Sequence, residues 1–121
     1  MSPRLVQRNK FIENLKSLLN YARSRGYDVQ LGEVFRTYWE AVEYVRLKLG
    51  ILNSKHRYGI AADVWVLDEN GNPVFDFKDG DRWDLIYRDL ADYWSKTLGQ
   101  TAGYYYKSPD KYHFELKENP A

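Results

Sequence analysis

Residues 54–63, SKHRYGIAAD, join a histidine to an alternating segment and decide the predicted fold. Over residues 60–67, apolar side chains recur at every second position, which is typical of a β-strand with one buried face. That apolar face consists of Ile60, Ala62, Val64 and Val66. Asp63 falls on the other face, beside the small Ala61, which leaves room for an ion. The segment therefore predicts a strand that packs on the core and presents a carboxylate on its opposite side.

His56 and Asp63 are candidate ligands of one metal ion, provided that the chain turns sharply between them. A fully extended chain would separate them by about 23 Å, whereas zinc ligands lie ~2.0–2.2 Å from the ion. Gly59 stands between the two residues and can adopt backbone angles that other residues avoid. We therefore expect a turn at Gly59 that brings His56 back to Asp63.

His113, the second of the two histidines, lies in the segment PDKYHFE, residues 109–115. In a strand, His113 and Glu115 would share the polar face and leave the apolar side chains on the other. Two imidazoles and one carboxylate suffice for a catalytic zinc with one open position, so His56, Asp63 and His113 form the predicted site. Glu115 either orients a ligand from behind or is a solvated strand residue, and both options stay open.

Asp110 precedes His113 by three residues, an offset that points to the opposite face of a regular strand. We therefore expect Asp110 in the loop that enters the strand, which Pro109 stiffens. A carboxylate near the open position of the metal, but not bound to it, is suited to act as a general base on the attacking water. The alternative that Asp110 only begins a turn stays open, since Pro-Asp pairs often do so.

The composition describes a single domain of ordinary size, residues 1–121, of which 44% are hydrophobic. Lys and Arg number 18 against 17 Asp and Glu, and this balance gives no reason to expect a nucleic-acid partner. The absence of cysteine excludes disulfides, thiolate metal sites and cysteine nucleophiles. The charged N-terminus has no apolar run typical of a signal peptide, and no stretch is long enough for a membrane span. We expect a monomer without membrane contacts.

The remaining patterns predict an α+β domain in which helices pack on an antiparallel sheet. Helices are expected over residues 2–26, 37–49 and 81–98, with a capping box at residues 37–40 and stops at Gly26 and Gly50. Strands are expected over residues 28–36, 60–67, 73–77 and 112–116, with an Asn-Gly turn at residues 69–72 and an active-site loop at residues 51–58. The predicted apolar faces are Leu5, Ile12, Leu15, Leu18, Leu19 and Ala22 in the first helix, and Leu85, Ile86, Leu90 and Trp94 in the third.

The pattern S-x-H-x-x-G-x-A-x-D in residues 54–63 matches, at all five fixed positions, the signature of the zinc peptidases of family M15. This family includes D-alanyl-D-alanine carboxypeptidases and dipeptidases, and the L-alanyl-D-glutamate endopeptidases that serve as phage endolysins. Residues 11–36 look like the leading helix and first strand of the small phage-type members, and the ending KSPDxxHF, residues 107–114, is similar to theirs. The resemblance covers most of the chain and implies a Hedgehog/DD-peptidase-like fold.

The resemblance also implies a role for each matched residue. The two histidines and Asp63 would bind zinc, and Asp110 would be the catalytic base. Arg36, at the end of the first predicted strand, would hold the substrate carbonyl or its oxyanion, and Ser54 would lie near the substrate. That substrate would be the stem peptide of peptidoglycan.

The tyrosine-rich stretch AGYYY, residues 102–106, departs from the family, which often has Gly-Gly-Asp in this region. Gly103 is the clear match that remains. Tyr104, Tyr105 and Tyr106 are candidates to line the substrate groove, and packing is at least as good an interpretation for them. The departure concerns the groove more than the predicted metal ligands.

Three functions stay open on the sequence alone. The short chain and the missing signal peptide favour an L-alanyl-D-glutamate endopeptidase, by analogy with phage endolysins. Such an enzyme would be made in the cytoplasm and would act on the cell wall or periplasm after release, through a holin if it is phage-encoded. The alternatives are a D-alanyl-D-alanine carboxypeptidase and a non-catalytic zinc-containing binding module. Asp110 argues against the binding module, because a pure binder needs no base.

Overall fold

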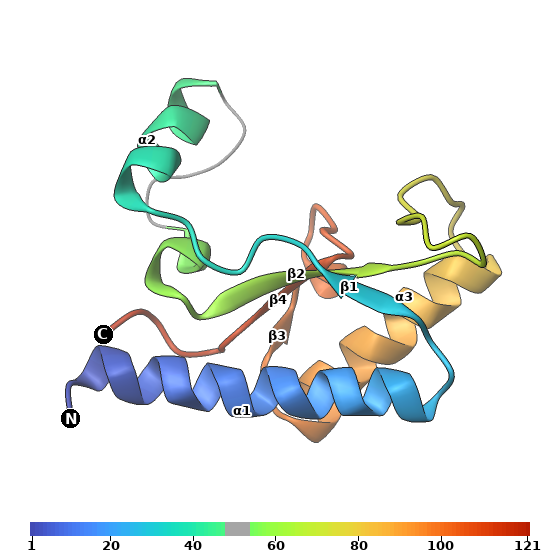
Figure 1. Ribbon diagram of the computed structural model, residues 1–121, viewed down its shortest axis with the longest axis horizontal. Helices are drawn as coiled ribbons and strands as arrows, with labels where there is room; N and C mark the ends of the chain where they lie inside the picture. The colour runs from blue at the N-terminus through green and yellow to red at the C-terminus, as the bar shows by residue number, and fades with distance from the viewer. Residues whose placement is uncertain (48–53) are drawn as a thin grey trace.

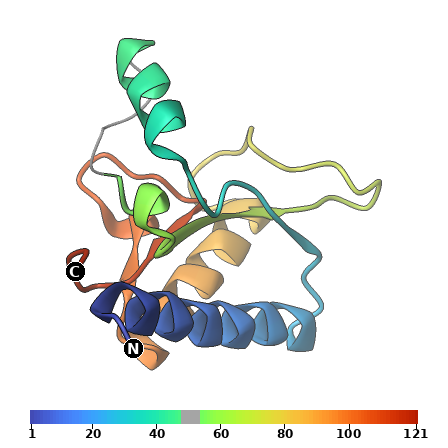
Figure 2. The same ribbon diagram turned by 60° about the vertical axis from the view of Figure 1, so that its left-hand side comes forward.

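The described residues, 1–47 and 54–121, form a four-stranded antiparallel sheet with helices on both sides in the computed structural model (Figure 1). The strands are β1 (Val29–Leu31), β2 (Ala61–Val66), β3 (Thr101–Ala102) and β4 (His113–Glu115), in the order β1-β2-β4-β3. Helices α1 (Pro3–Ser24) and α3 (Arg82–Asp92) cover one face, and α2 (Tyr38–Arg46) stands on the other side (Figure 2). The predicted α+β class is confirmed. Among these residues no helix has the length and apolar character that crossing a membrane requires.

Helix α1 begins and ends where its sequence signals predict. The Ser2 hydroxyl accepts a hydrogen bond from the Leu5 backbone N–H, Pro3 occupies the first turn, and Gly26 follows the helix with a φ of 77°. Its buried residues are Phe11, Leu15, Leu18 and Ala22. The buried face predicted for this helix also includes Leu5 and Ile12, and this part of the prediction is wrong because both side chains are exposed. A single stripe at positions i, i+4, i+7 and i+11 faces the sheet, and Ile12 lies about 100° around the helix from Phe11.

The core is built on the predicted apolar face of β2. Ile60, Ala62, Val64 and Val66 are all at most 1% exposed. From α3 and the following π-helical turn (Tyr93–Thr97), Trp94 packs edge-to-face on Phe11 and on Phe114, and its indole N–H lies 3.0 Å from the Glu115 carbonyl oxygen. The third helix begins at its Asp81 cap as predicted, but Leu85 is exposed, and Tyr87 and Ala91 are buried instead.

The segment after β1 runs beside β2 without forming a regular strand, although a strand to residue 36 is predicted. The Gly32 N–H donates to the Asp63 carbonyl, and the Asp63 N–H donates to the Glu33 carbonyl, both at 2.8 Å. A Cβ on Gly32 would lie 2.6 Å from the Trp65 ring. The backbone therefore passes directly over that indole, and its hydrogen bonds to β2 continue without strand geometry.

Helix α2 begins with the predicted capping box. The Thr37 hydroxyl accepts from the Glu40 N–H, and the Glu40 carboxylate accepts from the Thr37 N–H. The helix runs to Arg46, with Leu47 as its C-cap. The predicted end near residue 49, the stop at Gly50 and the first part of the predicted loop at residues 51–58 lie outside the described residues.

The predicted hairpin after β2 forms its turn but not its second strand. Gly71 takes a φ of 80° in the turn, and pairing of residues 73–77 is limited to one bridge between Leu67 and Pro73. The Tyr87 hydroxyl explains the difference, because it accepts from the Val66 N–H at 2.8 Å and donates to the Val74 carbonyl at 3.0 Å. A side chain from α3 thus replaces part of the ladder that a second strand would supply.

Replacing Tyr87 by Phe is expected to lower the free energy of unfolding by about 1–3 kcal/mol, because the buried Val66 N–H and the partly buried Val74 carbonyl lose their partner. Urea denaturation of the two proteins measures this difference. Tyr105→Phe is the control, since its exposed hydroxyl bonds to Asp92 where water can replace it. Equal losses in the two variants would contradict this role of Tyr87.

Candidate metal centre

The left-handed turn at Gly59 places His56 against β2, as the sequence predicts. His56 lies in the 3-10 helix η1 (Lys55–Tyr58), which begins at Ser54, whose hydroxyl accepts from the His56 N–H at 3.3 Å. Gly59 closes that helix with φ 71° and ψ 28°, a conformation that disfavours residues with a Cβ. The chain then reverses into Ile60 and β2.

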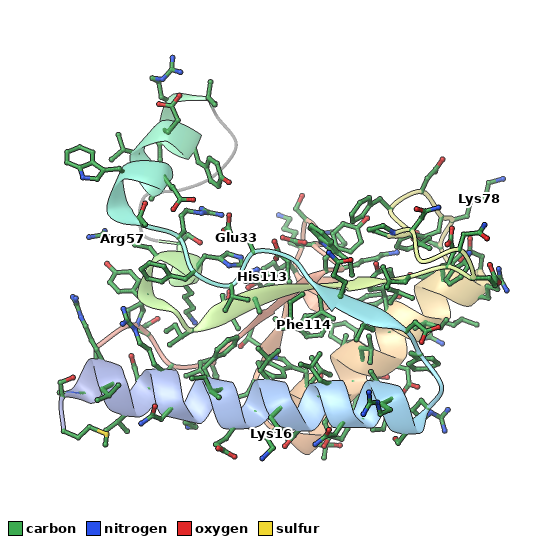
Figure 3. All side chains as sticks on the ribbon, in the orientation of Figure 1. Lys16, Glu33, Arg57, Lys78, His113 and Phe114 are labelled. Atoms are coloured by element: carbon green, nitrogen blue, oxygen red, sulfur yellow. The ribbon has the colours of Figure 1, made fainter. Side chains whose placement is uncertain are left out.

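The pairing of β2 with β4 sets Asp63 directly opposite His113. Opposed residues of an antiparallel pair project from the same face, so both side chains leave the sheet together. Figure 3 shows His113 on the face turned away from α1 and its neighbour Phe114 on the α1 side. The alternation predicted for both strands is confirmed, since Phe114 is fully buried in the core.

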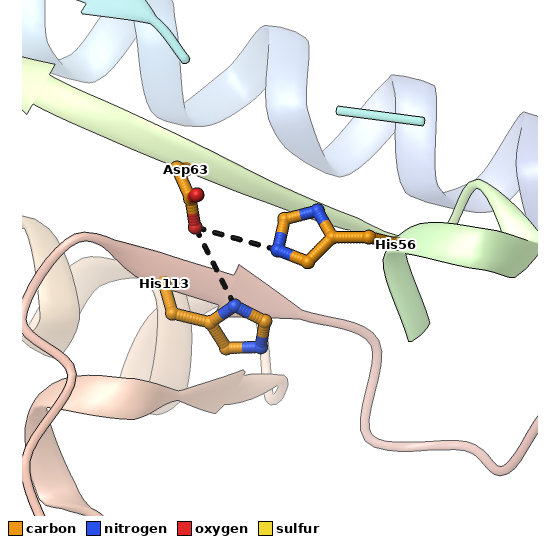
Figure 4. Close-up of side chains that lie close together, drawn as sticks. All are labelled: His56, Asp63 and His113. Carbon is orange, nitrogen blue, oxygen red and sulfur yellow. Dashed lines mark ion pairs between the residues drawn. The ribbon is translucent and has the colours of Figure 1, made fainter. Parts of the chain in front are cut away.

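His56, Asp63 and His113 converge with ligand atoms that all lie within 4.8 Å of one another (Figure 4). One Asp63 carboxylate oxygen, Oδ1, lies 3.4 Å from Nε2 of His56 and 3.6 Å from Nδ1 of His113. Two ligand atoms bound tetrahedrally to one ion at ~2.1 Å would lie about 3.4 Å apart. The three residues therefore fit a metal ion, with His56 offering Nε2 and His113 offering Nδ1.

The pKa values of Asp63 and His113 are both displaced by contacts within the centre. Burial alone would raise the pKa of Asp63, but hydrogen bonds with His113 and His56 outweigh it and lower that pKa to about 2. Burial would lower the pKa of His113, but contacts with Asp63 and Glu115 raise it to about 9. Without a metal ion, Asp63 is thus an anion at neutral pH and His113 carries a proton. A bound cation would replace that proton.

Glu115 lies behind His113 and contacts the ring nitrogen that does not face Asp63. Its Oε1 is 2.8 Å from Nε2 of His113, its Oε2 is 2.6 Å from the Lys55 ammonium, and it also accepts a hydrogen bond from the Tyr106 hydroxyl. Burial opposes these contacts, yet they lower the pKa of Glu115 to about 2. Of the two options left open by the sequence, the contacts favour orientation of His113.

Asp110 lies in the loop before β4, where the sequence places it. Its N–H donates to the Gly103 carbonyl at 2.9 Å, and its carbonyl accepts from the His113 N–H at 3.2 Å. Partial burial of the carboxyl group raises its pKa, and the charge of Asp63 adds to this effect against the opposing influence of His113. Asp110 does not belong to the group of three ligand residues found among the described residues.

Gly103 allows this loop to close on the centre. A Cβ at this position would lie 2.4 Å from the Asp110 carbonyl oxygen and 2.9 Å from the His113 Cβ. The glycine is needed for space, since the backbone of the Asp110 loop and the His113 side chain both pack against its Cα. The isolated glycine in a tyrosine-rich stretch was the sequence signal of this close approach.

Arg36 is brought next to the centre and is almost buried. Its backbone N–H donates to the His56 carbonyl at 2.9 Å, its guanidinium binds one Glu33 carboxylate oxygen through Nε and Nη2, and it lies over the Tyr44 ring at 4.4 Å. The predicted contact of Arg36 with a substrate carbonyl stays a prediction. Ser54 caps η1, and its predicted place near the substrate also stays a prediction.

Tyr104 and Tyr105 contact helix α3, whereas Tyr106 contacts the candidate metal centre. The Tyr104 hydroxyl donates to Asp84 at 3.0 Å, and that of Tyr105 donates to Asp92, so both phenols are held by α3 carboxylates. The Tyr106 ring lies 5.9 Å from the His113 ring, centroid to centroid, and its hydroxyl binds Glu115. A groove-lining role for Tyr104 and Tyr105 stays a prediction.

Two residues beside the centre were not foreseen from the sequence. Glu33 lies 3.5 Å from Nδ1 of His56, and Lys55 holds Glu115. Lys55 stands in the signature segment, but nothing in its spacing indicates a partner on the last strand. Glu33 precedes Arg36 by three residues, which is the available sequence signal of their pairing.

Binding of Zn²⁺ to the metal-free protein at pH 7 is expected to release about one proton, because His113 is charged there and must lose its proton to bind. The apparent affinity should rise with pH until the pH passes about 9, the pKa of His113. Calorimetric titrations in two buffers with different ionisation enthalpies measure the number of protons released. Heats that do not depend on the buffer would contradict the protonated state of His113.

Gly103→Ala is expected to lower the free energy of unfolding by about 1–3 kcal/mol and to weaken Zn²⁺ binding, because the added methyl group displaces Asp110 or His113. Urea denaturation and a metal titration measure the two effects. Ser108→Ala, an exposed change in the same loop, is the control. Metal affinity equal to that of the parent protein would show that the loop absorbs the methyl group without moving His113.

Neither a protein-family model nor a curated protein sequence matches this chain. A solved structure does match it, the crystal structure of the Serratia marcescens L-Ala D-Glu endopeptidase ChiX, with a TM-score of 0.64. The match covers 88% of this chain and 77% of the Serratia chain at 22% sequence identity. At that identity the likeness shows that the two proteins share a fold, which agrees with the DD-peptidase-like architecture predicted from the sequence.

Proposed function

We propose that residues 1–121 form one zinc-dependent peptidase domain of the M15 type, which hydrolyses an amide bond in the stem peptide of peptidoglycan. The bond between L-alanine and D-glutamate is the proposed target. The observation that carries the proposal is the convergence of His56, Asp63 and His113, with Asp110 in the adjoining loop. The shared fold with an endopeptidase of that bond supports the choice of substrate.

Zinc is the proposed metal because two imidazoles and one carboxylate, with a further position open, are the ligand set of many catalytic zinc sites. When bound, it would supply a Lewis acid next to the scissile carbonyl. The carboxylate behind His113 supports this assignment, since zinc-binding histidines commonly donate their second N–H to such a group. Glu115 stands in that place behind His113.

Asp110 is the proposed base that takes a proton from the attacking water and delivers it to the leaving amine. Its raised pKa brings the carboxyl closer to neutral pH, where both proton acceptance and proton return are efficient. Its main chain is fixed by Gly103 and His113, while its side chain is free of the ligand group. For Arg36, the family resemblance supports a contact with the substrate oxyanion, and the Glu33 ion pair sets the orientation of its guanidinium.

One experiment distinguishes the proposed endopeptidase from a carboxypeptidase and from a non-catalytic binding module. Purified peptidoglycan is digested with the zinc-loaded protein, and the products are identified by mass spectrometry. New L-alanine C-termini are expected from the proposed endopeptidase. Release of terminal D-alanine would identify a carboxypeptidase instead, and absence of cleavage on several wall chemotypes would leave a zinc-containing binding module. His56→Ala and Asp63→Ala should abolish both metal binding and cleavage.

Asp110→Asn is expected to keep zinc and to lower the rate of peptidoglycan cleavage about 10²–10⁴-fold, because it removes the base and spares the three ligands. Metal content by mass spectrometry and cleavage rate are measured on the same sample. Asp79→Asn, an exposed carboxylate change that affects an ion pair with Lys111, is the control. Loss of zinc from Asp110→Asn would mean that Asp110 helps to hold the metal and that its assignment as the base is wrong.

A further inference from the structure

The two ligand histidines differ in what satisfies their second ring nitrogen. Nε2 of His113 has a hydrogen-bond partner in Glu115 at 2.8 Å. Nδ1 of His56 is fully buried and lacks a hydrogen-bond partner among the described residues. A buried polar nitrogen without a partner is costly, and such groups in native proteins usually have a role.

A carboxylate stands close to that nitrogen. Oε1 of Glu33 lies 3.5 Å from Nδ1 of His56, slightly beyond hydrogen-bond distance. In Figure 3, Glu33 and His113 both lie on the side of the sheet turned away from α1. A shift of about 0.5 Å would bring this oxygen into a normal N–H···O distance. Glu33 therefore lies behind His56 on the side away from the metal site, in the way that Glu115 lies behind His113.

Backbone hydrogen bonds fix Glu33 relative to the metal ligands. The Glu33 carbonyl accepts from the Asp63 N–H at 2.8 Å, and three residues later the Arg36 N–H donates to the His56 carbonyl at 2.9 Å. The segment that carries Glu33 is thus tied at one end to Asp63 and at the other end to His56. The position of the Glu33 carboxylate therefore depends on two of the three proposed ligands, Asp63 and His56.

Arg36 orients the Glu33 carboxylate. Its Nε and Nη2 donate to the same oxygen, Oε1, at 2.9 and 2.5 Å. The guanidinium lies over the Tyr44 ring and is itself nearly buried, so it has few alternative positions. An ionised carboxylate has about four acceptor sites on its two oxygens, and the two Arg36 hydrogen bonds leave the group able to accept a further one from His56.

We infer that Glu33 is a positioning residue that accepts the Nδ1–H of His56 and so selects the tautomer that offers Nε2 to the metal. In a neutral imidazole one nitrogen carries the proton and the other the free lone pair. When a metal ion is held between Nε2 and Asp63, the lone pair of Nε2 points to the ion and the proton belongs on Nδ1, where a lone pair would meet the negative charge of Glu33. The inference rests on the metal site and is independent of the proposed substrate.

The test is the Zn²⁺ affinity of Glu33→Ala, measured by competition with a chromophoric chelator. Removal of a carboxylate behind a metal-binding histidine typically lowers metal affinity 10–100-fold, and that loss is expected here. Glu43→Ala is the matched control, because Glu43 forms the same kind of i,i+3 pair with Arg46 on the exposed side of α2. It should bind Zn²⁺ like the parent protein.

A second measurement separates positioning from a purely structural ion pair. In the zinc-loaded parent protein, the NMR signal of the His56 Nδ1 proton should exchange slowly with water, and in Glu33→Ala it should be lost to fast exchange. If the Glu33–Arg36 pair were only structural, its loss in Glu33→Ala would lower the free energy of unfolding and leave both this signal and the affinity unchanged. Affinity within threefold of the parent, with the Nδ1 proton still protected, would overturn the inference.

Glu33→Gln covers the case in which Glu33→Ala does not fold. The amide oxygen of the glutamine can still accept a hydrogen bond from Nδ1. The substitution removes the negative charge that pairs with Arg36. An upfield shift of the His56 Nδ1 proton, together with at least a threefold loss of affinity, would support the inference. An unchanged proton shift and affinity would overturn it. Because both readouts are binding properties, failure here would leave the proposed peptidase activity to be judged by the digestion experiment.

Discussion

The antiparallel pairing of β2 with β4 is the constraint on which the centre depends. It opposes Asp63 to His113, and the same parity sends Val64 and Phe114 into the core. A slip of one residue would exchange the two faces and would bury the carboxylate while exposing the apolar side chains. The hydrophobic core therefore sets the position of the two strand ligands, because the register that buries one face also aligns the other.

Electrostatic balance extends the centre beyond its three ligands. Acidic groups alternate with basic or imidazole groups along one continuous row, with neighbours between 2.5 and 3.6 Å apart. The row consists of Lys55, Glu115, His113, Asp63, His56, Glu33 and Arg36. A lysine and an arginine stand at the two ends, and their positive charges favour the charged form of the neighbouring carboxylates. A metal ion in the middle would take the place of the proton on His113 without breaking the alternation.

The sequence predicts the three proposed ligands better than it predicts the residues around them. His56, Asp63 and His113 follow from a motif and from strand alternation, both of which are local in the chain. Glu33 could not be derived in this way, because its contact with His56 depends on how an irregular segment lies against β2. The missing strand at residues 73–77 has a similar cause, since the Tyr87 hydroxyl from α3 takes part of its ladder. Contacts between distant elements account for these differences.

The loop of Asp110, the proposed base, is placed mainly through its main chain. Its main chain is bonded to Gly103 on one side and to His113 on the other, and the lack of a Cβ at Gly103 makes that approach possible. None of these constraints uses the Asp110 carboxylate. A ligand needs its side chain fixed, whereas a base must gain and lose a proton as the reaction proceeds. The Asp110 carboxylate accepts a hydrogen bond from the Tyr112 backbone and lies outside the group of His56, Asp63 and His113, so the proposed base is held beside the proposed ligands without being one of them.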